Sequence, residues 1–466
     1  MGHRSGRRSS IATAAMSAEV RIDDRESTNQ RPREYERGSA GVRTIASLGA
    51  VSEFLPRQTV AIGNELIGAF PAVVIQGARQ VGKSTLARQL AADRRAVVVT
   101  LDDRAVREAA AADEVAFVEQ CPDGILVIDE VQREPELLLA IKASIDRDRR
   151  PGRFLLTGSA DLLSVKGQTD SLAGRAATLH LRAFSQGELV GHPEDFVTTL
   201  RSGTPAQEFT TEWNRARYAA ALVAGGYPDV RGLSARLRQA WLDSYLERIL
   251  QRDAAQLPSG GHTGRLRSVL TLVAANQGGE LVKARVADGA QIPRNTITAY
   301  LDVLRSLYLV DQLPPWTPNL TKREVGRPKA FVSDSALAMR LNRQTEQQLV
   351  PLTFDGIGGL FEAFIASELL KQQAWSEQDY QVFHFRDRDG AEVDLVIELD
   401  DGSVVGIEVK ASSSYRGDQF TGLRFLKDKL GDRFLAGIVI GMSGVGYQYA
   451  DRLYGLPAAA LWQWRP

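Results

Sequence analysis

Several features that assign proteins to a class are scarce in this sequence of 466 residues. Its single cysteine, Cys121, excludes an intramolecular disulfide framework and predicts a reducing, cytoplasmic location. Lysine plus arginine and aspartate plus glutamate are equal at 57 each, so the whole chain has no charge excess to attract nucleic acid or a membrane. No run of about eighteen apolar residues occurs, so no membrane partner is expected. The length predicts about three domains.

The strongest motif is a glycine-rich loop. Residues Gly77 to Ser84 match G-x-x-x-x-G-K-S and follow the apolar run Ala72 to Ile75, which predicts a buried strand. In such a loop the backbone N–H groups surround phosphates, Lys83 reaches the β and γ oxygens, and the Ser84 hydroxyl binds Mg²⁺. An ordinary glycine turn before a helix is the alternative. We therefore expect ATP and Mg²⁺ as cofactors, and the expected binding residues are Gly77, Ala78, Arg79, Gln80, Val81, Gly82, Lys83, Ser84 and Thr85.

A pair of acids ends a second apolar run, Ile125 to Ile128. This pattern predicts a buried parallel strand whose carboxyl end carries Asp129 and Glu130, at the edge where open α/β sheets bind ligands. We expect Asp129 to hold the Mg²⁺ that accompanies ATP, and Glu130 to orient or deprotonate the attacking water. The adjacent glutamate, together with the lack of an Asn-Lys-x-Asp motif, favours ATP hydrolysis over a GTP switch. The alternative for Glu130 is a helix cap.

Three further residues are candidates for sensing or stabilising the γ-phosphate. The run Phe154 to Thr157 predicts another strand, and Thr157 or Ser159 at its end would contact the γ-phosphate or the lytic water. Arg175, in Ser-Leu-Ala-Gly-Arg, is a candidate arginine finger acting in cis or from a neighbouring subunit, so a homo-oligomer is one expected partner arrangement. A surface ion pair is the other explanation of Arg175.

The order of predicted elements divides the chain. Residues 1–50 are polar and arginine-rich without periodicity, which predicts a disordered arm. Residues 51–200 alternate strands and helices, with a further strand expected at Val97 to Leu101, which predicts an α/β domain with a parallel sheet. There, Asp102 or Asp103 is expected to reach the site or to cap the next helix. Residues 201–261 show helical periodicity and are expected to form a lid or connector.

The next region, residues 262–345, contains a local basic surface. Residues 262–343 have twelve Lys or Arg against six Asp or Glu. Three predicted helices and a basic hairpin indicate a winged helix-turn-helix that contacts DNA, although the same fold also serves in protein contacts. The expected DNA-facing side chains are Arg294, Asn295 and Thr298 on the third helix and Lys322, Arg323, Arg327 and Lys329 on the hairpin.

The last region, residues 346–466, carries a different group of charges. Two predicted strands flank the turn Asp400 to Gly402, and residues two apart on a strand share a face, so Glu408 and Lys410 should project together with Asp394 nearby. Asp394 and Glu408 would bind a Mg²⁺, Glu362 would be a further ligand, and Lys410 would offset charge during cleavage of a phosphodiester. An exposed cross-strand salt bridge is the alternative.

Several motifs together resemble those of prokaryotic AAA-type ATPases with a C-terminal domain of unknown function. The resemblance covers most of the chain after residue 50 and rests on Gly77 to Ser84, Leu126 to Gln132, Leu156 to Ser159, Ser171 to Arg175 and Gly225 to Pro228. It implies a P-loop NTPase domain of AAA type, then a winged helix, then a small α/β restriction-endonuclease-like core of the PD-(D/E)-x-K type. Asp394, Glu408 and Lys410 match that last signature, with Val393 in place of its proline.

Two functions from different classes agree with these patterns. In the first, ATP turnover gates a DNA-directed, metal-dependent nuclease. In the second, the chain is an ATP-dependent, DNA-binding regulator whose nuclease-like domain is a platform without catalysis. The intact Asp394, Glu408 and Lys410 set favours the first, and the lack of a translocation motif favours the second.

Overall fold

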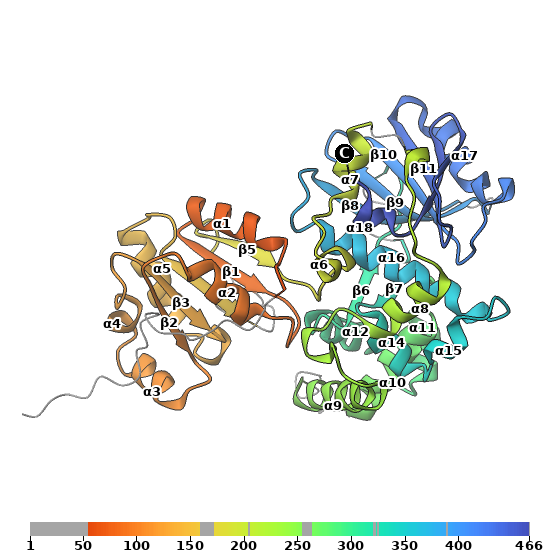
Figure 1. Ribbon diagram of the computed structural model, residues 1–466. Coiled ribbons are helices and arrows are strands. Elements are labelled where there is room, and N and C mark those ends of the chain that lie inside the picture. The colour runs from red at the N-terminus through yellow and green to blue at the C-terminus, as the bar shows by residue number, and fades with distance from the viewer. Residues whose placement is uncertain are drawn as a thin grey trace, which may run out of the picture. The chain divides into compact units, whose positions relative to one another are not determined.

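The computed structural model describes residues 55–158, 172–203, 206–253, 263–319, 323, 326–387 and 390–465 (Figure 1). The predicted arm, Ser159 and Lys322 lie outside these residues, so the expectations for them stay predictions.

The first sheet is parallel throughout, as the alternation of strands and helices predicted. Its strand order is β2-β3-β4-β1-β5, and every neighbouring pair is parallel. Four of the strands occupy the predicted runs, whereas the fifth, which has a half-exposed pattern, was not anticipated. The strands are β1 (Ala72–Gln76), β2 (Ala96–Thr100), β3 (Ile125–Asp129), β4 (Phe154–Gly158) and β5 (Ala176–His180).

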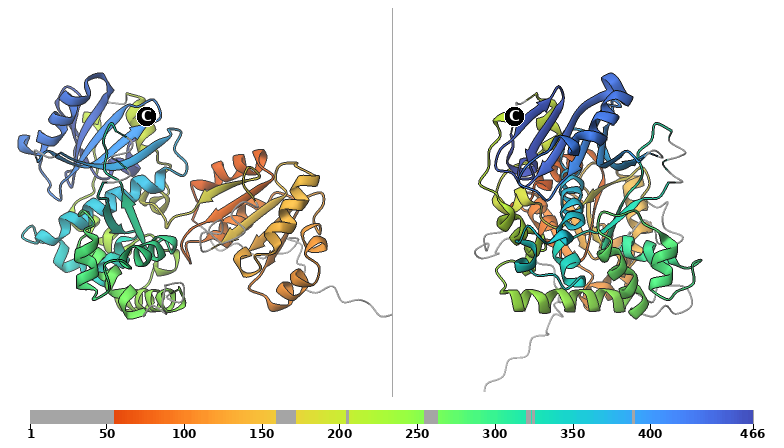
Figure 2. Two further views of the ribbon diagram at one scale, coloured as in Figure 1. Left: turned by 180° about the vertical axis from the view of Figure 1, so that it is seen from behind. Right: turned by 90° about the vertical axis from the view of Figure 1, so that its right-hand side faces the viewer.

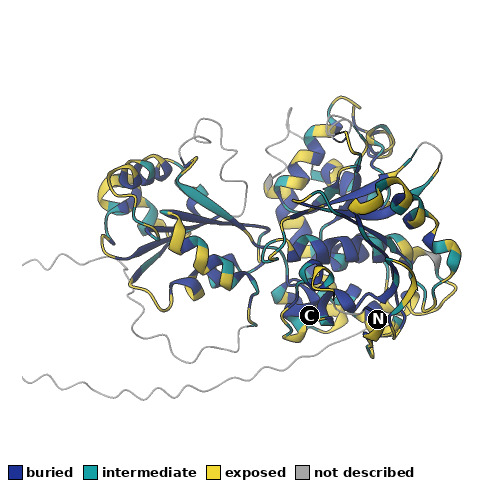
Figure 3. Ribbon diagram, turned by 90° about the horizontal axis from the view of Figure 1, so that it is seen from above, coloured by how far each residue is buried: buried dark blue, intermediate teal, exposed yellow. Residues whose placement is uncertain are grey.

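Helices cover both faces of this sheet. Alternate residues of the buried strands point to opposite sides, so Val73 and Ile75 pack in one apolar cluster with α1 and α2, while Ala72 and Val74 pack in another with α3, α4 and α5. Figure 3 shows the strands buried and the outer helix faces exposed. The helices are α1 (Thr59–Ala69), α2 (Lys83–Ala91), α3 (Arg104–Ala112), α4 (Glu114–Val118) and α5 (Leu137–Arg147).

Two short helices and two longer ones follow. α6 (Gln186–Val190) and α7 (Phe196–Arg201) contact the last helix, α18 (Ala460–Gln463), so they pack with the end of the chain although the sequence placed them in the first domain. α8 (Arg215–Ala224) and α9 (Ala235–Asp253) confirm the predicted helical character of this stretch.

Three helices and a two-stranded sheet follow in the predicted order. They are α10 (Thr263–Ala275), α11 (Lys283–Gly289), α12 (Ile297–Ser306), β6 (Val310–Leu313) and β7 (Lys329–Val332), with β6 and β7 antiparallel. The apolar faces of the three helices share one core, and α14 (Ser335–Leu341) and α15 (Glu346–Leu349) follow β7.

The final sheet is mixed, with strand order β12-β13-β11-β10-β9-β8. The predicted strand pair around Asp400 to Gly402 is confirmed as antiparallel β9 and β10, with Glu398 opposite Val404. Leu395 and Ile397 face α16 (Gly358–Gln372), whereas Val393 and Val396 face α17 (Thr421–Leu430), so the two helices cover opposite faces (Figure 2). The strands are β8 (Tyr380–Arg386), β9 (Glu392–Leu399), β10 (Val404–Val409), β11 (Phe434–Gly441), β12 (Tyr447–Ala450) and β13 (Leu453–Pro457).

Candidate nucleotide site and C-terminal charged cluster

The glycine-rich loop joins β1 to α2, and the structure explains why two of its positions require glycine. A Cβ at Gly77 would lie 2.0 Å from the carbonyl oxygen of Leu181, and Gly82 has φ +98°, which L side chains rarely adopt. Gly82 is also the N-cap of α2 and provides no side-chain cap. The first N–H groups of α2 are therefore oriented to receive an anion.

Lys83 is the cation of this loop. Its ammonium donates to two carbonyl oxygens of the loop, those of Gly77 at 3.0 Å and Ala78 at 2.8 Å. The side chain is buried, and this burial lowers the pKa of Lys83 to about 8, against the opposing effect of the Glu130 carboxylate. Its hydrogen bonds go to neutral acceptors, so the negative charge of a phosphate would satisfy it better.

Asp129 lies among three hydroxyl groups at the carboxyl ends of the strands. Its Oδ1 accepts from Ser84 at 2.7 Å and from Thr157 at 2.5 Å, and its Oδ2 lies 3.4 Å from the Thr100 hydroxyl. Ser84 and Asp129 thus bring together a hydroxyl and a carboxylate oxygen, the hard ligands that Mg²⁺ prefers. The donor set fits the metal ion that accompanies ATP.

Glu130 follows directly and lines the same cavity. Its backbone is left-handed, with φ +58°, and its N–H donates to the Thr157 hydroxyl at 3.1 Å. The Gln132 amide donates to the Glu130 carboxylate. Thr157 therefore positions both acids, and its expected contact with the γ-phosphate stays a prediction.

A cavity of about 890 Å³ opens at this edge of the sheet. Nucleotide-sized ligands occupy pockets of roughly 300–1,000 Å³, so the volume is sufficient. Seven loop residues from Arg79 to Thr85 line it together with Glu130 and Asp102, while Asp103 caps α3 by accepting from the N–H of Ala105 at 2.8 Å. Both expectations for the Asp102 and Asp103 pair are thereby confirmed.

The opposite wall of the cavity is formed by α9. From the sequence, this helix was expected only to belong to a lid or connector. Trp241, Tyr245 and Arg248 line it, the first two with ring planes stacked at 5.0 Å and 9°. The Tyr245 hydroxyl donates to the carbonyl of Arg79 at 3.2 Å and so contacts the loop directly. Their spacing of four and three residues places all three on one face of a helix, a signal that was present in the sequence.

A second residue missed from the sequence is Arg57, which precedes α1. Its guanidinium is buried, donates to the carbonyl of Val81 in the loop, and pairs with Glu188 at 3.0 Å. It also lies over the ring of Phe184 at 3.6 Å. Burial lowers the pKa of Arg57, but the Glu188 carboxylate opposes this effect. Arg57 therefore holds the loop from behind.

Arg175 lies at the end of the first sheet where the parallel strands begin, opposite the end that carries the glycine-rich loop. It directly precedes β5, whose first residue pairs with Ala72 at the start of β1. Five residues of strand, roughly 16 Å, separate that end from the glycine-rich loop. Arg175 pairs with Asp146 at 2.8 and 2.9 Å, so the structure does not bring it to the phosphate site of its own chain. A finger acting on a neighbouring subunit stays a prediction.

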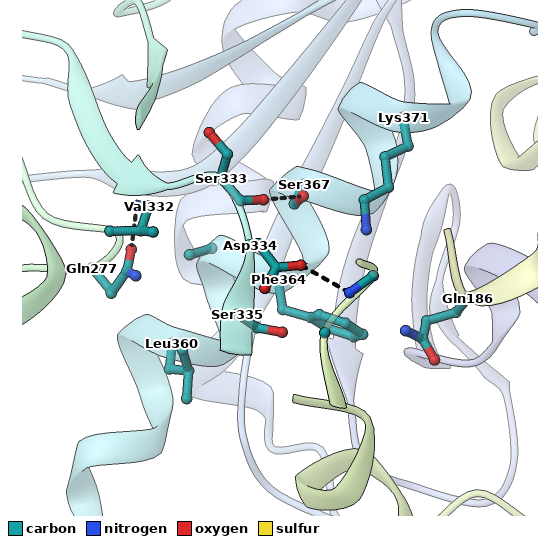
Figure 4. A pocket seen from close by; sticks show the side chains of 13 residues that line it. Gln186, Gln277, Val332, Ser333, Asp334, Ser335, Leu360, Phe364, Ser367 and Lys371 are labelled. Atoms are coloured by element: carbon teal, nitrogen blue, oxygen red, sulfur yellow. Dashed lines mark hydrogen bonds between the residues drawn. The ribbon is translucent and has the colours of Figure 1, made fainter. Parts of the chain in front are cut away.

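A second cavity, between α16 and the start of α14, is enclosed and very small (Figure 4). Its volume is about 10 Å³, which is about one water molecule. Buried Asp334 lines it and accepts from the N–H of Gly226 at 2.8 Å. A Cβ at Gly225 would lie 2.6 Å from the same carboxylate, which explains the paired glycines of the Gly225 to Pro228 motif structurally.

The C-terminal candidates converge as the strand pattern predicted. Lys410 Nζ lies 2.6 Å from Glu408 Oε1 and 4.0 Å from Asp394 Oδ2, and the same Asp394 oxygen accepts from the N–H of Val409 at 2.8 Å. Burial and the nearby Asp394 raise the pKa of Glu408 to about 7. The cluster is therefore largely withdrawn from solvent, unlike the exposed salt bridge that was the alternative.

A residue from outside this domain lies in the cluster, and it corrects one expectation. Lys329, predicted to face DNA, is 3 % exposed, and its Nζ lies 2.7 Å from Glu362 and 3.5 Å from Asp394. Burial and Asp394 raise the pKa of Glu362 to about 8 despite Lys329. Within the described part of the chain, no three acidic, histidine or cysteine side chains are arranged to hold a metal ion.

A second cation of the predicted basic hairpin, Arg323, also differs from the expectation that it faces DNA. Arg323 is buried and pairs with Glu398 of β9, because the hairpin packs against the C-terminal sheet and its positive charges find carboxylates there. By contrast, Arg294, Asn295 and Thr298 are exposed as expected, although α12 begins only at Ile297. Arg327 of the hairpin is also exposed as expected, so the exposed basic surface consists of the helices together with this residue.

Comparisons with known proteins give matches to three parts of the chain. Residues 69–190 match the model of an AAA domain, and residues 215–348 and 357–461 match two domains of unknown function, DUF8612 and DUF4143. Residues 69–190 are therefore similar to an AAA-type P-loop domain. Uncharacterized proteins of Mycobacterium tuberculosis and Mycobacterium bovis are each 29 % identical over 344 residues, which is 74 % of this chain and 71 % of theirs.

Two solved structures show a weaker likeness. A Walker-type ATPase of Pyrococcus abyssi has a TM-score of 0.41 and 16 % identity, covering 62 % of this chain and 96 % of its own. DnaA of Aquifex aeolicus, bound to AMPPCP, has a TM-score of 0.27 and 11 % identity, covering 53 % and 86 %. Among the described helices, none has both the length and the apolar character needed to cross a membrane.

Proposed function

We propose that this chain binds ATP and hydrolyses it, and that it acts with DNA. ATP binding and hydrolysis are supported by one observation. Glu130 and the loop from Arg79 to Thr85, which includes Lys83, line the same cavity of about 890 Å³. Lys83 and the N-terminus of α2 would bind the phosphates. Ser84 and Asp129 would hold Mg²⁺, which neutralises charge on the phosphoryl oxygens when it is bound.

Glu130 is the proposed base or water-orienting group. Its N–H is fixed by Thr157 and its carboxylate by Gln132, so the side chain has a defined direction toward the cavity. The exposed Arg248 of α9 lies on the opposite wall and supplies positive charge there. An arginine from a neighbouring subunit, with Arg175 as the candidate, would add to it in an oligomer.

Hydrolysis can be tested with Glu130→Gln, which keeps the size of the side chain but removes its charge. We expect ATP binding to persist while the turnover rate falls by about 100-fold or more. Glu134→Gln, four residues further along the chain, is the matched control and should hydrolyse ATP at the wild-type rate. Wild-type turnover in Glu130→Gln would remove Glu130 from catalysis.

The proposed contact with DNA rests on the helices α10 to α12. Together with β6 and β7 they have the element order of a winged helix, and their exposed cations include Lys283, Arg285 and Arg294. Lys283 donates to Thr298 at 3.2 Å, and Arg294 pairs with Asp288 at 2.6 Å, so the cations lie around the exposed start of α12.

A salt titration with a labelled duplex tests this surface. Binding should weaken steeply with salt, and replacing Lys283, Arg285 and Arg294 by alanine should reduce the slope by about one for each lost phosphate contact. The control replaces three exposed arginines on the first domain, Arg94, Arg95 and Arg104, and so removes equal charge. Equal losses in both variants, or no binding at low salt, would favour a protein-contact module.

A metal-dependent nuclease in the C-terminal domain is the second candidate function. It is favoured by the convergence of Asp394, Glu408 and Lys410, which match the PD-(D/E)-x-K pattern in position, with Glu362 nearby as a candidate further ligand. In the present arrangement Lys329 and Lys410 already pair with these carboxylates, so a divalent ion would compete with both ammonium groups. This observation favours the alternative, in which the domain is a platform for an ATP-dependent regulator.

A further inference from the structure

One buried ammonium lies between carboxylates from two elements of the C-terminal domain. Lys329 Nζ is 2.7 Å from Glu362 on α16, and 3.5 Å from both Asp394 and Glu392 on β9. The lysine itself comes from β7, at the end of the preceding region of the chain. An element of a different domain thus supplies the cation that these carboxylates require.

Two further oxygens of the cluster already have hydrogen-bond donors. Asp394 Oδ2 accepts from the N–H of Val409, and Glu408 Oε1 is bound by Lys410. Glu408 Oε2 is buried without a hydrogen-bond donor. Because Mg²⁺ keeps several waters and is usually held by one or two carboxylates, the question is which pair of carboxylates could share it. A divalent ion between Glu362 and Asp394 would have to replace Lys329.

The hairpin that carries Lys329 is held at several points. Arg323 pairs with Glu398, and His384 Nε2 on β8 donates to the carbonyl of Arg327 at 3.0 Å. On its other side, the carbonyl of Pro328 accepts from the N–H of Leu281 at 2.8 Å. Withdrawal of Lys329 would therefore require movement of a paired strand or a new side-chain conformation inside a packed core.

We propose that Lys329 is the resident cation of the C-terminal cluster, where it excludes divalent metal ions and fastens β7 to α16 and β9. If the Lys329 ammonium and a divalent ion shared the same carboxylates, they would lie close together, and their positive charges would repel each other strongly. This inference concerns the C-terminal candidate function and is independent of the proposed ATP site.

Binding of Mn²⁺ to the full chain, followed by electron paramagnetic resonance without nucleotide, tests the proposal. We expect the wild type and Asp394→Asn to bind Mn²⁺ equally weakly, because Asp394 is already occupied. Lys329→Met keeps most of the side-chain volume and removes the charge. It should gain one site with affinity increased about tenfold or more, and adding Asp394→Asn should abolish that site.

Two outcomes would overturn the proposal. One is a wild-type Mn²⁺ site that Asp394→Asn removes, since the carboxylate would then bind metal with Lys329 in place. The other is folded Lys329→Met without a new site. If Lys329→Met does not fold, the comparison of wild type with Asp394→Asn still decides. ATP binding measured on the same proteins separates this result from the proposed function, because failure there would leave the Mn²⁺ comparison intact.

Discussion

The nucleotide site and the C-terminal cluster both gather charged side chains at the ends of buried strands, but they balance those charges differently. Lys83 donates to neutral carbonyls beside an open cavity, so a phosphate would improve its environment. Lys329 is enclosed by carboxylates. The comparison teaches that a match to a catalytic pattern becomes informative only when the partners of each charge are known.

Removal of Lys329 should have the largest effect on stability. Lys329→Ala leaves Glu362 and Asp394 buried without their cation, and breaking a buried ion pair in this way costs about 3–5 kcal/mol of unfolding free energy. Urea denaturation measures the loss. Lys427→Ala, which removes a lysine paired with exposed Asp451 in the same domain, should change stability little. Equal effects in both variants would contradict the buried role of Lys329.

Thr157→Val should disturb the positions of Asp129 and Glu130 in the nucleotide site without preventing ATP from binding. The hydroxyl that bonds Asp129 and accepts from Glu130 is lost, while the shape of the side chain is kept. Because the change affects positioning and not phosphate contacts, we expect turnover to fall by about tenfold with ATP affinity nearly unchanged. Steady-state kinetics and equilibrium binding measure the two quantities. A parallel loss of affinity would instead indicate direct contact with the phosphates.

A buried carboxyl pair, formed by Glu194 between α6 and α7 and Glu368 on α16, sharpens the comparison, since its charge is internal but incompletely balanced. Burial, followed by the neighbouring Glu368, raises the pKa of Glu194 well above its ordinary value. The folded state therefore retains a proton that the unfolded chain releases, so stability should fall as pH rises above about 4.5.

Glu194→Gln should remove this dependence. The amide oxygen can still accept from the N–H of Gly187, which now bonds Glu194 Oε2, and the amide NH2 in the place of Oε1 can donate to the Ser185 hydroxyl. Between pH 5 and pH 8, we expect the wild type to lose on the order of 1 kcal/mol more than the variant. Parallel stability curves in urea at the two pH values would show that Glu194 carries its charge in the folded state.

Arg175→Ala should have the smallest effect. Arg175 pairs with Asp146 on the surface, and such pairs contribute little to stability. ATP affinity and stability should stay at wild-type values, and Asp146→Ala serves as the control for loss of the pair. A fall in hydrolysis that grows with protein concentration in Arg175→Ala alone would instead assign a finger to a neighbouring subunit.

The parts of the molecule that depend on local pattern were predictable from sequence. The glycine-rich loop, four of the five strands of the first sheet and the helix cap at Asp103 follow from residues close together in the chain. The convergence of Glu408, Lys410 and Asp394 also followed, because a tight turn fixes the register of β9 and β10.

The parts that depend on distant packing were not predictable. Lys329 and Arg323 were expected on a surface because they occur in a basic run, yet both meet carboxylates more than thirty residues away. Arg57 and the α9 wall were missed for the same reason, since only folding brings Tyr245 to the carbonyl of Arg79. Periodicity predicts which face of an element is apolar, but not which element covers it.

Calorimetric titration with ATP and Mg²⁺ tests the central claim most directly. We expect one nucleotide per chain in the wild type and in Asp394→Asn. In Lys83→Ala we expect binding weakened by about 100-fold or more, because the Lys83 ammonium, which now hydrogen-bonds to neutral carbonyls, is the proposed ligand of the phosphates. Wild-type affinity in Lys83→Ala, or loss of binding in Asp394→Asn, would contradict the account.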